Sequence, residues 1–364
     1  MEEIGIGIIG SQFVSHIHAE ALQRVPGARV VAAASATEEH IREFAGKFAI
    51  PQWFTDYRRV LELPEVDLVI LGVPNSLHCQ VTVDAAAAGK HVVCEKPLCM
   101  NLREADTMIT ACKEHGVKLM YAEELCFTPK YVRLKQLVDE GALGKVYLMK
   151  QAEKHDGPHS AWFWDVEQSG GGVTLDMGCH AFEFFRWMLG RPPALDVYAQ
   201  MDTYVHKGRT RGDDDANIIV NFEGQVTGIA EESWAKKGGM EDRAEVYGSA
   251  GVAYADLLRG SSILTYSETG YGYAVEKAGS TRGWSFTMFE EIRNYGFPQE
   301  MEAFVSCVRD DTPPPVSGED GRAVLEIIFA AYASAAQGRK VALPYTPPAE
   351  FARRPADIWL AARE

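Results

Sequence analysis

The sequence predicts an α/β protein with two domains, the first built on a parallel sheet and the second on a mostly antiparallel sheet. In the first third of the chain, short β-rich runs alternate with helical patterns, which is typical of a parallel sheet with crossover helices. After Pro129, longer runs alternate apolar with polar residues, which predicts mostly antiparallel strands. The length of 364 residues also exceeds what one hydrophobic core usually serves.

The expected strands of the first domain, residues 1–123, are apolar nearly throughout, as in a sheet that is covered on both faces. These strands span residues 4–9, 29–34, 67–73, 91–94 and 118–122. Helical patterns lie between them at residues 15–24, 38–48, 80–88 and 102–115. The order of the elements predicts repeated strand-helix-strand units around one parallel sheet.

The second domain, residues 124–364, begins with a helix over residues 131–140 and continues through Gly141 and Gly144. Its strands are expected at residues 146–152, 196–205, 216–222, 225–234 and 243–247. Further helices are expected at residues 176–189 and 321–336. These elements predict an α+β domain, whose closing helices are candidates for packing back on the first domain.

The bulk composition excludes several kinds of partner. The chain carries 51 acidic and 36 basic side chains, and its formal net charge of -15 repels phosphate backbones and anionic membrane surfaces. No apolar run approaches the roughly 20 residues of a membrane span, and the N-terminus is acidic where a signal peptide is basic. The seven cysteines lack any CxxC pair and are expected to be reduced packing residues. We therefore expect a cytoplasmic protein that binds neither nucleic acid nor membranes.

A glycine-containing turn closes the first expected strand. Gly5, Gly7 and Gly10 match the letters of the GxGxxG fingerprint, but the first two fall inside the strand. Because the fingerprint needs its first glycine at the strand end, Gly10 is the relevant residue. In that register, Gln12 replaces the second glycine and Ser15 the third, so the motif alone leaves a plain strand-closing loop as an equal alternative. The candidate pyrophosphate site comprises Gly10, Ser11, Gln12, Phe13 and Val14.

The end of the second expected strand bears on the choice of cofactor. The acidic residue that would bind an adenosine ribose is absent there, and Ser35 stands in its place. Ser35 and Thr37 are able to accept a 2'-phosphate, but Glu38 and Glu39 follow and no arginine is adjacent. The sequence therefore favours NAD(H) and leaves NADP(H) open.

Three further segments carry a specific resemblance. They are Pro-Asn-Ser-Leu-His at residues 74–78, Gly-Lys-His-Val-Val-Cys-Glu-Lys-Pro at residues 89–97, and the glycines at residues 170–172 followed by Asp176 and His180. In this order and spacing they resemble the Gfo/Idh/MocA family, which includes glucose-fructose oxidoreductase and inositol dehydrogenase. The resemblance extends nearly from end to end of the chain, with further matching segments at residues 246–251, 317–321 and 341–344.

The resemblance implies a Rossmann domain joined to a large, open, mixed sheet, with the active site between the domains. It implies a small carbohydrate or cyclitol as substrate and a homo-oligomer, a dimer or tetramer, formed through that sheet. It assigns to Lys96 the contact with substrate and nicotinamide, and to Asp176 and His180 the role of acid-base pair. The residues that it places beside the cofactor are Pro74, Asn75, His78, Glu95 and Lys96.

The chemistry of the three catalytic candidates agrees with that resemblance. Asp176 and His180 are four residues apart on an expected helix, so both side chains are expected to leave one helix face. Histidine titrates near neutrality, the range that a general base needs when an alcohol loses its proton. Lys96 is able to stabilise the developing alkoxide. The alternatives are a surface salt bridge for the pair and an extended solvent-exposed position for the lysine.

A third group combines polar and aromatic side chains in a way that suits a carbohydrate. Its members are Glu124, Glu153, His155, His159 and Trp162. Aromatic rings cover the C–H faces of sugars, while acids and histidines bind hydroxyl groups. An interdomain loop with tryptophan packing is an equal alternative. Residues 125–128 depart from the family pattern, which bears on the substrate. No compact metal motif such as HExxH is present, so we expect no metal.

Three functions remain open at this point. The first is a dehydrogenase or reductase that acts on an alcohol or ketone of a sugar, glycoside or cyclitol. The second is glycoside cleavage in which NAD is reduced and regenerated within one turnover. The third is a nucleotide-binding regulator without catalysis, which Gln12 and Ser35 favour but the presence of Lys96, Asp176 and His180 disfavours.

Overall fold

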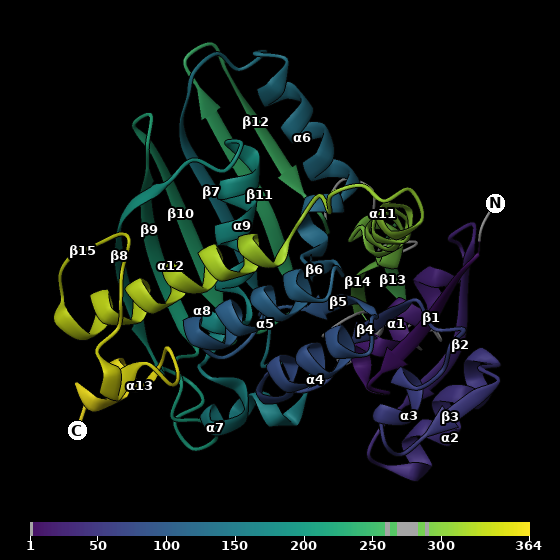
Figure 1. Ribbon diagram of the computed structural model, residues 1–364. Coiled ribbons are helices and arrows are strands. Elements are labelled where there is room, and N and C mark those ends of the chain that lie inside the picture. Colours follow the sequence, from purple (N-terminus) through teal and green to yellow (C-terminus); the bar gives the residue numbers. More distant parts are fainter. Residues whose placement is uncertain (1–2, 259–262, 268–282, 288–290) are drawn as a thin grey trace. The chain divides into compact units, whose positions relative to one another are not determined.

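The computed structural model describes residues 3–258, 263–267, 283–287 and 291–364. Two compact units are distinguished in it (Figure 1). Unit 1 comprises residues 1–127 and 296–325, and unit 2 comprises residues 128–295 and 326–364. The chain therefore leaves unit 1 after residue 127 and returns to it at residue 296.

Unit 1 contains a six-stranded sheet in the order β3-β2-β1-β4-β5-β6. The strands are β1 (Ile4–Ile9), β2 (Ala28–Ala34), β3 (Gln52–Phe54), β4 (Leu68–Leu71), β5 (His91–Glu95) and β6 (Leu119–Ala122). Every pairing between them is parallel, and β1 and β4 are buried along their whole length. The predicted parallel sheet is confirmed. The strand order reverses between β1 and β4, which is where doubly wound sheets bind ligands.

Helices cover the sheet of unit 1. They are α1 (Phe13–Leu22), α2 (Glu38–Phe48), α3 (Arg58–Leu61), α4 (Asn75–Ala87), α5 (Leu102–Glu114), the 3-10 turn η1 (Glu124–Phe127) and α11 (Phe297–Arg309). The predicted starts of two helices were wrong, since α1 begins at Phe13 and α4 at Asn75. Pro74 precedes α4 in an extended conformation and so sets its start. Helix α11 contacts α1, with the rings of His18 and Phe297 at 5.9 Å.

Unit 2 contains a seven-stranded sheet in the order β12-β11-β7-β10-β9-β8-β15. The strands are β7 (Val146–Lys154), β8 (Ala194–Asp202), β9 (Asp215–Phe222), β10 (Val226–Ser233), β11 (Glu241–Gly248), β12 (Gly251–Asp256) and β15 (Val341–Ala342). Of the pairings in it, β7 with β10 is parallel and the others are antiparallel. The predicted large, mostly antiparallel mixed sheet is confirmed. A separate two-stranded sheet joins β13 (Ile263–Ser267) and β14 (Gly283–Thr287).

Further helices and 3-10 turns lie wholly or partly in unit 2. They are α6 (Pro129–Asp139), η2 (Ala161–Trp164), α7 (Val166–Ser169), α8 (Val173–Asp176), α9 (Gly178–Met188), α10 (Glu291–Asn294), α12 (Gly318–Gln337), η3 (Ala349–Phe351) and α13 (Asp357–Ala361). Helix α12 begins in unit 1 and ends in unit 2. Helix α9 lies against β7 and β10 (Figure 1). A side chain at Gly228 would lie 2.6 Å from the Phe185 ring, so this close approach requires glycine.

Two predicted elements of unit 2 were wrong in their bounds. The helix expected at residues 176–189 is divided at Met177, so α8 ends at Asp176 and α9 begins at Gly178. Helix α8 begins at Val173, before the predicted start at residue 176. It begins there because the Asp213 carboxylate accepts the backbone N–H groups of Gly172 and Thr174. Asp176 and His180 therefore belong to different helices, and the argument from one helix face does not hold.

The second error concerns the strand expected at residues 196–205, which ends at Asp202. Residues 204–206 instead turn their backbone N–H groups toward the carboxylate of Asp214. A buried charged acceptor offers these amides a stronger partner than a neighbouring strand does.

Two other features of the chain are the apolar character of its helices and the state of its cysteines. Within the residues that the structure describes, no helix is both long and apolar enough to cross a bilayer. All seven cysteines are free thiols, and six of them are buried. Burial raises the pKa of Cys94 and Cys99 well above the ordinary thiol value, so these two thiols are neutral packing groups.

Candidate functional site

The turn after β1 has the geometry of a pyrophosphate site. Gly10 has a φ of 120°, and a Cβ on it would lie 2.1 Å from the carbonyl oxygen of Gly72. Helix α1 begins directly after Gln12, which caps it with no side-chain hydrogen bond, and its first turn contains no acid. Among the described residues, the buried hydroxyls of Ser11 and Ser15 have no hydrogen-bond partner. The N-terminal amides of α1 therefore fit the pyrophosphate of a dinucleotide.

The other residues predicted at this turn differ in exposure. Phe13 is exposed and Val14 half-buried. The side chain of Gln12 reaches His40 on α2, with Nε2 and Nδ1 at 3.0 Å, so it is directed toward α2 and not across the turn. Ser35 directly follows β2, is half-buried, and donates its backbone N–H to Phe54.

The carboxyl ends of β1, β4, β5 and β6 carry the remaining predicted residues of unit 1. Since these strands are parallel neighbours, the residues after them lie along one edge of the sheet. Asn75 is buried at the first turn of α4, Lys96 directly follows β5, and Glu124 opens η1 after β6. The structure thus brings these side chains to the sheet edge that Gly10 also occupies.

His78 connects two segments of that edge. Its Nδ1 lies 3.0 Å from the carbonyl oxygen of Pro97, and its Nε2 lies 3.0 Å from that of Val73. Burial lowers the pKa of His78, although these carbonyl contacts act in the opposite direction. In this structure the imidazole therefore ties α4 and the end of β4 to the segment that follows Lys96.

Glu95 and His18 form a buried pair beside Lys96. The two side chains meet at 2.7 Å, and the second carboxylate oxygen of Glu95 accepts the backbone N–H of Lys96 at 2.9 Å. Burial acts to raise the pKa of Glu95, but the hydrogen bond and charge of His18, with the charge of Lys96, outweigh it and lower the pKa. Glu95 is thus ionised and fixes the backbone at the lysine.

Two buried acids near Lys96 were missed by the sequence analysis. Burial raises the pKa of Glu123 to about 8, against the opposing charge of Lys96. Burial and the charges of Glu124, Glu95 and Glu123 raise the pKa of Glu300 well above its usual range. Glu123 is the first residue after a buried strand, a position that marked it equally with Glu124. Glu300 lies in α11, nearly 180 residues further along the chain, and no local pattern pointed to it.

In unit 2, the two predicted acid-base residues have separate partners. The indole N–H of Trp234 donates to Oδ2 of Asp176 at 3.1 Å. Nε2 of His180 lies 4.0 Å from Oε2 of Glu153, within ion-pair range, and both groups are buried. Glu153 was predicted as a substrate residue. Trp234 was missed because it is the last residue of a predicted strand, where an aromatic side chain usually belongs to the core.

Glu153 lies in a row of acids across three strands. The strand register places Glu232 of β10 and Asp242 of β11 directly beside it, on the buried face of the sheet. Burial and the charge of Asp242 raise the pKa of Glu232 well above its usual range, which favours its neutral form. The Tyr131 hydroxyl donates to Asp242 at 2.6 Å. The three acids come from strands that are far apart in the sequence, so the sequence alone did not indicate that they lie side by side.

The predicted loop residues form two aromatic contacts. The rings of His155 and His159 lie 5.0 Å apart, and Nδ1 of His155 contacts the carbonyl oxygen of Gly157 at 2.7 Å. Because a carbonyl only accepts, Nδ1 of a neutral His155 carries the proton and Nε2 is the acceptor. Trp162 stacks on Phe163 with ring centres 3.8 Å apart. Two of the five predicted substrate residues thus lie together in one loop.

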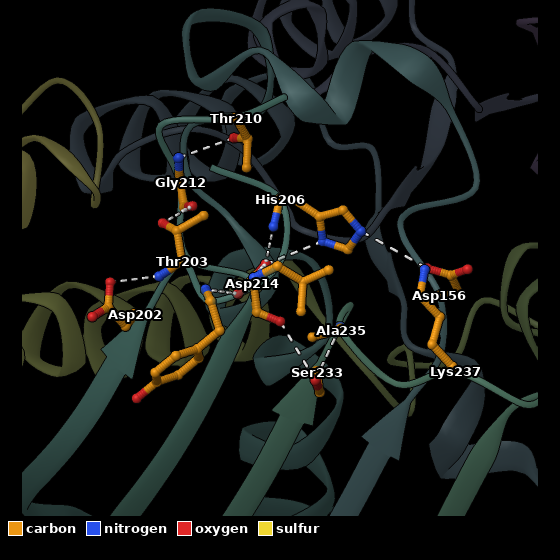
Figure 2. A network of polar contacts seen from close by, with 12 residues as sticks. Asp156, Asp202, Thr203, His206, Thr210, Gly212, Asp214, Ser233, Ala235 and Lys237 are labelled. Carbon is orange, nitrogen blue, oxygen red and sulfur yellow. Dashed lines mark hydrogen bonds and ion pairs between the residues drawn. The ribbon is translucent and has the colours of Figure 1, made fainter. Parts of the chain in front are cut away.

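A network around Asp214 supports the neighbouring loop (Figure 2). The fully buried carboxylate of Asp214 accepts the backbone N–H groups of residues 204–206 and contacts Nδ1 of His206 at 3.1 Å. Nε2 of His206 lies 3.8 Å from Asp156, and the His206 ring lies 4.8 Å from the ring of Trp164. The carboxylate thereby holds the loop after β8 against the aromatic segment.

A surface cavity of about 390 Å³ opens between this loop and α7. Its lining residues are Trp164, Asp165, Val166, Glu167, Lys207, Gly208, Arg209, Thr210 and Arg211. The guanidinium of Arg209 lies 4.2 Å from the ring centre of Trp164. Residues 207–211 were not singled out from the sequence, because a short basic loop is usually a solvated segment.

The comparison with known proteins agrees with this geometry. Residues 4–123 match the oxidoreductase family with an NAD-binding Rossmann fold, and residues 131–254 match the GFO/IDH/MocA C-terminal domain. The fold and the turn after β1 thus define an NAD-binding oxidoreductase. The chain belongs to the Gfo/Idh/MocA family, which confirms the resemblance found in the sequence.

Several relatives match nearly the whole chain. The myo-inositol 2-dehydrogenase of Thermotoga maritima is 30% identical, with 93% of this chain and 98% of the relative covered. The scyllo-inositol 2-dehydrogenase (NAD(+)) of Bacillus subtilis is 28% identical, with 94% and 96% covered. Among solved structures, GenD2 from gentamicin A biosynthesis in complex with NAD is 31% identical, with a TM-score of 0.89 and 95% and 97% covered. The family is one of NAD-binding sugar and cyclitol dehydrogenases.

Proposed function

We propose that this chain transfers a hydride between NAD and a secondary hydroxyl or ketone of a sugar, glycoside or cyclitol. The observation that carries the proposal is the buried arrangement in unit 2, where His180 faces Glu153 and the preceding helix ends at Asp176. A histidine beside carboxylates is suited to accept a hydroxyl proton near neutral pH. Relatives named as inositol dehydrogenases support the substrate class.

The proposed mechanism assigns one task to each residue. Bound NAD supplies the hydride acceptor for oxidation, and NADH the donor for reduction. His180 takes the hydroxyl proton as the substrate C–H bond breaks and the carbonyl forms, and it returns that proton in the reverse direction. Asp176 and Glu153 stabilise the imidazolium that results. Lys96, held by the Glu95 contact to its backbone, stabilises the negative charge that develops on the substrate oxygen.

Substrate recognition is assigned to the polar and aromatic group predicted from the sequence. His155 is assigned to a substrate hydroxyl, and the contact of its Nδ1 with the Gly157 carbonyl fixes the ring. Glu124, His159 and Trp162 supply further hydroxyl partners and an apolar surface for the sugar ring. NAD is favoured over NADP because Ser35 is followed by two acids at the start of α2, which disfavour a 2'-phosphate.

We also propose that the chain forms a homo-oligomer through the open face of the unit 2 sheet. One row on this face runs across six strands through Tyr198, Ile219, Ile229, Lys150, Glu245 and Tyr254. None of these side chains is buried, and Tyr254 is 67% exposed. A sheet face that leaves isoleucines and tyrosines in water is typical of a contact surface.

The test is a panel of sugars, glycosides and cyclitols, followed by nicotinamide absorbance and by product mass. With the substrate identified, H180A should lower kcat by ~10² to 10⁴, the usual cost of losing a general base, while NAD affinity stays at the wild-type value. The exposed H115A serves as the matched control with wild-type turnover. Near-wild-type turnover of H180A would refute the assignment. Product that forms without net nicotinamide reduction would instead identify redox-cycling cleavage.

A further inference from the structure

Trp234 is held rigidly at the end of β10. Its side chain is fully buried, its backbone N–H donates to the carbonyl of Asp214 at 2.8 Å, and its own carbonyl accepts from Gly157 at 2.8 Å. The indole N–H donates to Oδ2 of Asp176 at 3.1 Å. With its backbone fixed on both sides, the indole presents its donor at one place.

Two other aromatic rings hold the indole in orientation. The rings of Trp164 and Phe163 meet the Trp234 ring edge-on, at 5.4 and 6.4 Å. The Trp164 ring lies 4.8 Å from His206, which the Asp214 carboxylate fixes (Figure 2). The backbone and the ring of Trp234 therefore both depend on Asp214, one through its carbonyl and the other through its carboxylate.

An indole donor has particular properties as a partner for a carboxylate. It donates only, carries no charge and does not titrate, so the donor itself does not change with pH. A hydrogen bond to the ionised form stabilises that form. Because it engages Oδ2, it also prevents the Asp176 carboxylate from rotating. The hydrogen bond therefore favours the ionised form of Asp176 and one orientation of its carboxylate.

We propose that Trp234 is a positioning residue for the reaction, acting through Asp176. This inference rests on the proposed function, in which Asp176 stabilises the charged imidazole of His180. Trp234 touches neither proton nor hydride in this scheme. It sets the orientation of Asp176 and the lowest pH at which Asp176 remains ionised.

The test is W234F, which removes the N–H group and keeps an aromatic ring. Losing a hydrogen bond to a charged group should lower kcat about 10- to 100-fold. The acidic limb of the kcat/KM profile should move to higher pH, because Asp176 loses a donor that favours its ionised form. NAD affinity should remain at the wild-type value. W359F makes the same change at another buried tryptophan and should keep the wild-type pH profile.

A comparison with D176N separates the proposed role of Trp234 from the proposed role of Asp176. If D176N loses turnover but W234F keeps both wild-type kcat and the wild-type pH profile, the positioning role is overturned. If D176N itself turns over at the wild-type rate, the proposed role of Asp176 fails instead.

A readout independent of activity guards against a W234F variant that does not fold. In protein labelled with ¹⁵N-tryptophan, D176N should shift one of the seven indole N–H signals, that of Trp234, because its charged acceptor becomes neutral. A spectrum in which no indole signal moves would overturn the inference.

Discussion

At the scale of single residues, Glu123 couples the stability of unit 1 to pH. The side chain is fully buried, and its pKa is raised from 4.5 to about 8, chiefly by burial. Between these two pH values the unfolded chain binds fewer protons at this position than the folded chain does. The free energy of unfolding therefore falls as the pH rises from about 4.5 to about 8, and this contribution is complete only below the lower value.

We expect E123Q to remove this dependence. Relative to the wild type, its free energy of unfolding should rise between pH 5 and pH 8.5, by on the order of 4 kcal/mol if the whole shift is realised. Urea unfolding at several pH values measures the difference. E114Q, on the exposed side of α5, is the matched control and should run parallel to the wild type. A wild-type to E123Q difference that is independent of pH would contradict the assignment.

Residues of the candidate site could be predicted from the sequence where they belong to a short motif. Gly10 was correctly placed at the strand end, because the hydrophobic run fixed the end of β1. The four-residue spacing of Asp176 and His180 suggested one helix face, but a helix boundary falls between them. Trp234, Glu232 and Glu300 escaped notice because their neighbours are distant in sequence, and one chain without its fold does not show such contacts.

At the scale of elements, the loop after β8 owes its form to a single acceptor. Asp214 binds three consecutive amides, with N to O distances between 2.6 and 2.8 Å. The alternation of apolar and polar residues continues to Val205, so the pattern predicted strand where this loop forms. Hydrogen bonds to one buried carboxylate thus outweighed the strand preference of residues 204–206. The composition of this segment did not indicate that outcome.

D214N should loosen this loop. An asparagine turns an N–H₂ group toward at least one of the amide donors, so at least one charge-assisted hydrogen bond is lost, at about 1.5 to 3 kcal/mol each. Hydrogen exchange followed by mass spectrometry should show faster exchange in peptides over residues 203–210. D310N, at an exposed position, is the control and should leave those peptides unchanged. Unaltered exchange in D214N would show that the loop is held by other contacts.

At the scale of the whole molecule, the sequence anticipated both sheets because each follows from strand texture, apolar runs in unit 1 and alternating runs in unit 2. The strand order within them was beyond its reach. Pairing of β7 with β10 joins residues 146–154 to residues 226–233, and no local signal fixes that choice. Helix α11 was not predicted either, and its place in unit 1 depends on contacts with α1 near the other end of the chain.

The open sheet face gives a prediction for assembly. I229R places a second positive charge beside Lys150 on the neighbouring strand and should shift the protein to smaller species in sedimentation velocity. Circular dichroism should remain that of the wild type, because the side chain is not part of the core. V205R alters an exposed valine outside the sheet and should leave the distribution unchanged. An I229R protein that sediments as the wild type does would exclude this face as the contact.

The return of the chain to unit 1 at residue 296 has a consequence for biosynthesis. The first 127 residues leave the ribosome long before α11, whose Phe297 covers His18 of α1. At roughly 5 to 20 residues per second, translation of the intervening segment takes on the order of ten to thirty seconds. Throughout that time the nascent first unit lacks α11, and the side of α1 that α11 covers stays open. Unit 1 is therefore completed only after the strands of the large sheet in unit 2, except β15, have been synthesised.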